Sequence, residues 1–84
     1  AHYLRKHFPN IRVFGFDSIS LSSFQHRDVG KLAHKEFLDP EQPLIVLEDM
    51  DLTQVNHLSF PSNICVAPMR IACCDGLPCT VYGW

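Results

Sequence analysis

The chain contains the sequence Leu44-Ile45-Val46-Leu47-Glu48-Asp49, in which four apolar residues are followed directly by two acidic ones. A run without polar residues at alternate positions is typical of a strand that is covered on both faces, as in a parallel sheet. A second run, residues 11–16, is β-branched and aromatic apart from Arg12 and Gly15, and Asp17-Ser18 follows it. We therefore expect two buried parallel strands whose carboxyl ends place acidic side chains at one edge of a sheet.

A helix is expected between these two strands. Its apolar face is formed by residues three and four positions apart, namely Val29, Leu32, Ala33 and Phe37. Asp28 can cap its amino end, and the helix should end before residue 39. His34 lies at the margin of the apolar face, one turn after Gly30, where the missing side chain lets another group approach the imidazole closely. The order strand, helix, strand predicts an α/β fold in which His34, acidic side chains and a hydroxyl group meet at one edge.

The remaining elements are separated by Pro, Gly, Asn and Asp residues. Residues 1–8 are expected to form a helix that ends at Pro9, which cannot continue it. Residues 51–57 are expected to form a short helix. Three further short strands are predicted over residues 64–68, 69–74 and 79–84, and residues 75–78 form the expected turn between the last two.

Composition limits the possible classes of partner. The 84 residues include seven Lys and Arg against nine Asp and Glu, a net charge of -2, so a surface for nucleic acid or for an anionic membrane is not indicated. No apolar run approaches the ~20 residues that cross a bilayer. A hydrophobic fraction of 46% is high for so short a chain, so we expect part of this apolar surface to contact another polypeptide.

The four cysteines are interpreted as buried thiols. Cys73 and Cys74 are adjacent, and Cys65 and Cys79 lie in apolar, strand-like surroundings. This pattern favours a reducing, cytoplasmic compartment. A zinc site formed by all four thiolates, or a redox module built on them, is an alternative, although the adjacent pair lacks the two-residue spacer that lets two thiolates reach one ion.

His34 and Glu48 are the candidate metal ligands. Imidazole and carboxylate without thiolate form the ligand set of a catalytic zinc or manganese site rather than of a structural zinc site. Such a metal makes water acidic enough to attack an amide or ester carbonyl. Spacing alone does not separate this hypothesis from an ordinary helix histidine and a solvated glutamate at the end of a strand.

Five stretches of the chain resemble motifs of a known family, in the same order and with similar separations along the chain. They are Phe14-Gly15-Phe16-Asp17-Ser18-Ile19-Ser20, Ala33-His34, Ile45-Val46-Leu47-Glu48-Asp49-Met50-Asp51-Leu52, Pro68-Met69-Arg70-Ile71 and Asp75-Gly76-Leu77-Pro78. Together they resemble the C-terminal portion of the cyclase family of metal-dependent hydrolases, which includes bacterial kynurenine formamidase and isatin hydrolase. The resemblance spans residues 3–82, but only about the last third of a family member.

The resemblance implies a fold, a metal and a set of site residues. The fold would be a swivelling β/β/α domain, with residues 1–84 forming the C-terminal part of a single hydrolase domain that has a mixed sheet and flanking helices. Family members are usually dimers or larger homo-oligomers and bind one or two divalent metals such as zinc or manganese. His34 resembles the family's C-terminal histidine ligand, with a share in proton transfer, and Glu48 resembles the glutamate ligand of the second metal.

Secondary site candidates are Asp17, Ser20 and His26. Asp17 and Ser20 resemble the family's Asp-x-x-Ser stretch after the strand, for which we expect a structural role, with Asp17 hydrogen-bonding the following loop. His26 precedes the helix and is expected at the surface or at the cap, although the segment Gln25-His26-Arg27 could face the site. The residues that bind the substrate are not identified by the sequence.

The family's defining motif, His-x-Gly-Thr-His-x-Asp followed by Pro-x-His, does not occur in the chain. Two ligands leave most of a divalent metal's coordination unfilled. We therefore expect the C-terminal piece of a larger enzyme, packed against the missing N-terminal portion and inactive alone. The implied reaction is hydrolysis of an amide C–N bond by metal-activated water, in an arylformamide such as the tryptophan catabolite N-formylkynurenine or in a cyclic amide. The alternative is a catalytically degenerate subunit or a protein-interaction domain.

Overall fold

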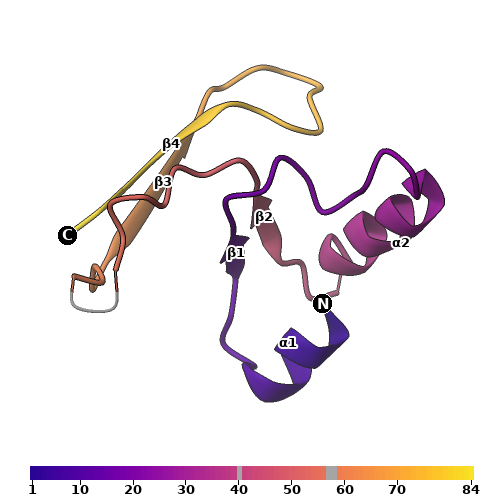
Figure 1. The fold of residues 1–84 in the computed structure, drawn as a ribbon, viewed down its shortest axis with the longest axis horizontal. Helices are drawn as coiled ribbons and strands as arrows, with labels where there is room; N and C mark the ends of the chain where they lie inside the picture. Colours follow the sequence, from indigo (N-terminus) through magenta and orange to yellow (C-terminus); the bar gives the residue numbers. More distant parts are fainter. Residues whose placement is uncertain (40, 57–58) are drawn as a thin grey trace. The chain divides into compact units, whose positions relative to one another are not determined.

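A computed structural model of the chain describes residues 1–39, 41–56 and 59–84 (Figure 1). These residues form a small mixed α/β structure with two two-stranded sheets. The chain divides into two compact units, Ala1–Gln54 and Val55–Trp84. In the part of the chain that the structure describes, no helix is long and apolar enough to cross a membrane.

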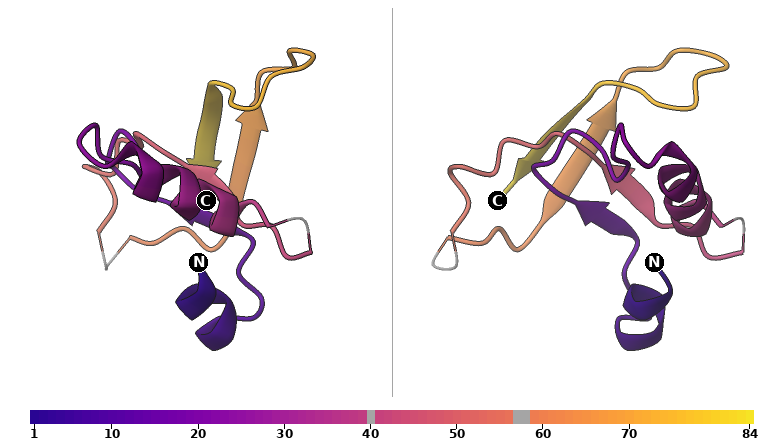
Figure 2. Two further views of the ribbon diagram at one scale, coloured as in Figure 1. Left: turned by 90° about the vertical axis from the view of Figure 1, so that its right-hand side faces the viewer. Right: turned by 45° about the vertical axis from the view of Figure 1, so that its right-hand side comes forward.

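The first unit contains the predicted strand, helix and strand. Strand β1 (Val13–Gly15) pairs in parallel with β2 (Ile45–Leu47), and helix α2 (Arg27–Phe37) connects them. Parallel strands require such a crossover because a tight turn cannot join them. Backbone hydrogen bonds continue past the strand ends, with Asp49 N–H donating to the carbonyl of Ser18 at 2.8 Å. The two carboxyl ends therefore lie side by side, as the sequence predicts (Figure 2).

Helix α2 covers one face of this strand pair. The ring of Phe14 in β1 stacks on that of Phe37 in α2 with their centroids 5.4 Å apart. Val13 and Ile45 are paired in register on the opposite face and are 38% and 54% exposed. The expectation that both faces of the strands are covered is therefore wrong for this end of the pair, because Val13 and Ile45 remain exposed on the face opposite Phe14.

The core of the first unit lies where α2, the following loop and β2 meet. Phe37, Leu44 and Leu47 are the buried hydrophobic residues among those described, and Leu44 is only 2% exposed. Arg5 of helix α1 (His2–His7) donates to the carbonyl oxygens of Glu36 and Phe37 and, at 2.9 Å, to that of Gln42. The carbonyls at a helix end lack partners within the helix, so Arg5 satisfies the end of α2 and holds α1 against it.

The second unit is a hairpin. Strand β3 (Ile64–Pro68) pairs antiparallel with β4 (Cys79–Gly83), in register from Ile64 opposite Gly83 to Pro68 opposite Cys79. The strand predicted over residues 69–74 is wrong, because those residues form part of the connecting loop and turn at residues 72–73. Pro78 has no N–H group to continue the ladder, so the pairing ends where Met69 N–H donates to the Pro78 carbonyl at 3.0 Å.

Two further expectations about helices are corrected. No helix forms over residues 51–56, and residue 57 lies outside the described residues. Asp51 instead accepts hydrogen bonds from Thr53, from its N–H at 3.1 Å and from its hydroxyl at 2.6 Å, a local turn that competes with a helix. Asp28 is not the cap of α2, because His26 occupies that position. Asp28 lies in the first turn, where its negative charge interacts favourably with the positive amino end of the helix dipole.

Candidate functional site

The structure brings His34 and Glu48 together. His34 comes from α2, and Glu48 directly follows β2. Their atoms Nε2 and Oε1 are 3.2 Å apart, and the two side chains are 35% and 32% exposed. The strand–helix–strand order produces this meeting, because the crossover helix runs beside the strand that ends in Glu48.

Gly30 allows the loop before α2 to pack directly on the helix. A Cβ at position 30 would lie 2.0 Å from the Cβ of Ser22, so no side chain fits there. The sequence predicts a close approach at Gly30, and the approaching residue is Ser22. The loop that carries Ser20 and Ser22 is thereby held beside His34, one turn farther along the helix.

Hydrogen bonds fix the orientation of the His34 ring. Its Nδ1 atom lies 2.9 Å from the carbonyl oxygen of Gly30, which can only accept, so Nδ1 carries a proton. The Nε2 atom faces the Glu48 carboxylate, which is also an acceptor when ionised. Doubly protonated imidazolium satisfies both contacts, whereas in the neutral ring Nε2 carries the lone pair. Nε2 is therefore the atom able to exchange its proton for a metal ion.

The Glu48 carboxylate is held by three donors. Its Oε1 atom accepts from Leu21 N–H at 2.9 Å, from the Ser20 hydroxyl at 3.1 Å and from His34. Partial burial opposes ionisation, but the hydrogen bonds from Leu21, Ser20 and His34 outweigh it and lower the pKa of Glu48 below its ordinary value. No hydrogen bond from the described residues reaches Oε2. The carboxylate is thus ionised at neutral pH and has one oxygen open to a ligand.

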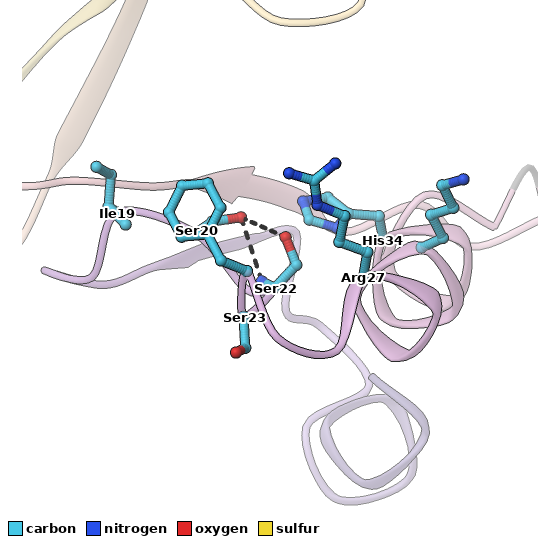
Figure 3. Close-up of a pocket in the computed structure, with 8 residues that line it drawn as sticks. Ile19, Ser20, Ser22, Ser23, Arg27 and His34 are labelled. Atoms are coloured by element: carbon cyan, nitrogen blue, oxygen red, sulfur yellow. Dashed lines mark hydrogen bonds between the residues drawn. The ribbon is translucent and has the colours of Figure 1, made fainter.

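The serine loop forms a short chain of hydroxyl groups. The Oγ atoms of Ser20 and Ser22 are 3.0 Å apart, and Ser22 N–H donates to Ser20 Oγ at 3.2 Å (Figure 3). Because Ser20 has one proton and gives it to Glu48, the hydroxyl of Ser22 is the donor between the two serines. Ser20 therefore contributes to the site by fixing Glu48, which agrees with a structural role.

A cavity of about 520 Å³ opens beside His34 (Figure 3). Its walls combine apolar, hydroxyl and basic side chains: Ile19, Ser20, Ser22, Ser23, Phe24, Arg27, Lys31 and His34. A volume of this size accommodates a small organic molecule. The alternative that the segment Gln25-His26-Arg27 faces the site holds for Arg27, whereas Lys31 is not predicted there. The spacing of four between these two residues, followed by His34 three residues later, is the signal that places them on one helix face.

The other candidates lie outside this cluster. Asp17 is exposed, and its carboxylate makes no hydrogen bond to the residues that the structure describes, so the expectation that it holds the following loop is wrong there. Glu48 holds the loop instead, reaching it from the neighbouring strand. His26 is exposed at the cap position of α2 and does not line the cavity, although its neighbour Arg27 does.

The donor groups fall short of a complete metal site. Within residues 1–39, 41–56 and 59–84, no group of three or more His, Cys, Asp or Glu side chains could hold a metal ion, which also contradicts a four-thiolate site. The four cysteines are free. Cys73, Cys74 and Cys79 are exposed and only Cys65 is partly covered, so the expectation of buried thiols is wrong for three of them.

Comparisons with protein-family models, with curated proteins and with solved structures found no match to this chain.

Proposed function

We propose that this chain supplies two ligands, His34 and Glu48, to the divalent metal site of a hydrolase that cleaves an amide C–N bond. The substrate class is an arylformamide or a cyclic amide, and the metal is zinc or manganese. Support comes from the pairing of imidazole and carboxylate at the carboxyl edge of parallel strands, beside a cavity of substrate size. The second support is the order of motifs, which resembles that of the cyclase hydrolases. On the same resemblance we propose that the chain is part of a swivelling β/β/α fold.

The two side chains suit such a metal. A metal-binding histidine commonly donates its other ring N–H to a carbonyl or carboxylate, and His34 donates Nδ1–H to Gly30. Glu48 is ionised and keeps Oε2 open. A catalytic zinc takes three protein ligands and a water, so two ligands form only part of the set. We propose that the remaining ligands come from a polypeptide outside these 84 residues.

Each residue has a separate task in the proposed reaction. The metal, when bound, supplies an acidified water and stabilises charge on the substrate carbonyl oxygen. Gly30 orients the His34 ring, and Leu21 N–H and the Ser20 hydroxyl hold the Glu48 carboxylate in place. Where His34 is not a ligand, its imidazolium form carries an Nε2 proton that can pass to a leaving amine in the adjacent cavity.

Metal titration of the 84-residue chain tests this proposal. Added zinc or manganese should perturb the amide NMR signals of residues around His34 and Glu48 with weak affinity, since two ligands bind a metal poorly. Both His34→Ala and Glu48→Gln should abolish the response. His26→Ala is the matched control, because this imidazole lies at the start of the same helix but outside the cavity.

The opposite pattern contradicts the proposal. If His34→Ala leaves the metal response unchanged, or if only Cys73→Ser and Cys74→Ser remove it, the site lies elsewhere. Turnover of an aryl formamide by the isolated chain at the rates of complete hydrolases would refute the claim that ligands are missing.

A role in protein interaction is the second candidate, and the distribution of apolar side chains supports it. Three hydrophobic residues are buried among those described, whereas many large ones are exposed, including Ile45, Phe60 and Trp84. Exposed apolar surface on this scale is typical of chains that associate. Association with a second copy or with a partner subunit should show as a concentration-dependent mass in sedimentation. Its persistence in a His34→Ala/Glu48→Gln double variant would separate this role from metal binding.

A further inference from the structure

We propose that the cavity beside His34 binds an aromatic carboxylate, with Arg27 and Lys31 holding the carboxylate and with Ile19 and Phe24 contacting the ring. The inference rests on the proposed function, because it names the substrate class that the same site would accept: amides whose ring carries a negatively charged group. No part of it depends on the metal being bound.

The first argument is the basic stripe of α2. Arg27, Lys31 and His34 are separated by four and then three residues, so they lie on one face of the helix, and all three line the cavity. Like charges four residues apart disfavour a helix. A bound anion removes that repulsion and lies near the positive amino end of α2, which Arg27 begins.

The second argument is that these charges have no protein partner. Within the residues that the structure describes, neither the Arg27 guanidinium nor the Lys31 ammonium makes a hydrogen bond or an ion pair. The lining contains no Asp or Glu. Glu48, the carboxylate of the site, is already bound to His34, Ser20 and Leu21. The two cations are therefore free to pair with a ligand, and arginine is suited to bind a carboxylate through two hydrogen bonds.

The third argument is the apolar wall. Ile19 and Phe24 line the cavity, yet they are 70% and 82% exposed. A flat ring placed against them would cover apolar surface that the chain leaves in water, which favours binding. Aromatic surface and an adjacent cation pair together favour a compact aromatic anion. They do not favour a polyanion, since the chain carries a net charge of -2.

Benzoate and benzamide are the probes, because they share a ring and differ in charge. In metal-free buffer, NMR titration of the 84-residue chain should show benzoate binding about tenfold more tightly than benzamide. An Arg27→Gln/Lys31→Gln double variant should lose that preference while its benzamide affinity stays the same. Lys35→Gln on the same helix, outside the cavity, is the control and should change neither. Acetate, which has no ring, should bind more weakly than benzoate.

Several outcomes would overturn the inference. Equal binding of benzoate and benzamide, no benzoate binding at tens of millimolar, or an unchanged preference in the double variant would each do so. Helix content by circular dichroism checks that the double variant is folded, as expected for two exposed side chains. The result is separable from the proposed function. A metal response without a preference for benzoate would support the metal site and refute the anion site. A preference for benzoate without a metal response would support the anion site and refute the metal site.

Discussion

Replacing Gly30 with Ala should destabilise the first unit, although the same change stabilises most helices. Ala favours the interior of a helix over Gly by about 1 kcal/mol. Gly30 does not have a positive φ, so its backbone also fits Ala. The new Cβ, however, would lie 2.0 Å from Ser22 Cβ and 3.0 Å from Ser22 Cα. No rotamer relieves this contact, because a Cβ is fixed to the backbone.

The size of the effect follows from these two opposing contributions. Normal carbon contacts need a separation of about 3.5 Å or more, so the loop must move by about 1.5 Å. Overpacking costs roughly 1–3 kcal/mol, and a displacement of this size falls in the upper half of that range. After the gain in helix propensity, we expect a net loss of about 1–2 kcal/mol in the free energy of unfolding, or roughly 5–10 °C in Tm.

Circular dichroism during urea unfolding measures this loss through the signal of α2. The double variant Ser22→Gly/Gly30→Ala removes the Cβ that is struck, so it should recover much of the stability relative to Gly30→Ala. Gly76→Ala is the matched control, because a Cβ there has no atom within 4 Å. If Gly30→Ala is as stable as the parent chain or more stable, Ser22 does not pack on α2 as described. The serine loop would then not be held beside His34 and Glu48 by this contact.

Three further predictions concern stability. Folding lowers the pKa of Glu48 from its ordinary value of 4.5, so the stability it contributes is present above that pH and lost as the pH falls through the folded value. Glu48→Gln should therefore be less stable than the parent chain near neutral pH, and this difference in urea unfolding should shrink as the pH falls below 4.5. Arg5→Ala should cost about 1–2 kcal/mol in thermal unfolding because three carbonyls lose a charged donor, whereas Arg12→Ala, whose guanidinium donates only to nearby carbonyls, should cost less. Cys73 has a φ of 61°, so Cys73→Gly should leave the hairpin about 1 kcal/mol more stable than Cys74→Gly does; equal effects in guanidinium unfolding would contradict the strained turn.

The strand–helix–strand unit follows from the sequence because several local signals agree. Leu44–Leu47 is too short and too apolar for a surface helix, and the face from Val29 to Phe37 has a clear helical period. The close approach at Gly30 follows from its missing side chain. These signals suffice to bring His34 and Glu48 to one edge, because the crossover leaves few other arrangements.

The remainder of the site depends on contacts that the sequence alone does not specify. Leu21 contributes through its backbone N–H, which every residue except proline possesses. Lys31 has the sequence context of a solvated helix side chain, and only the structure shows that it lines the cavity together with Arg27. The strand predicted over residues 69–74 does not form for a similar reason. Its apolar residues are typical of a strand, but the residue opposite its first position is Pro78, which has no N–H group to donate across the ladder.

The most direct test of the central claim is the state of the His34 ring when zinc is added to the chain. Nitrogen NMR of the imidazole distinguishes the two ring atoms. The account predicts that Nδ1 keeps its proton, bonded to Gly30, while Nε2 loses its contact with Glu48 and binds the metal. Both ring signals unchanged at saturating zinc, or coordination through Nδ1, would contradict a metal site formed by His34 and Glu48.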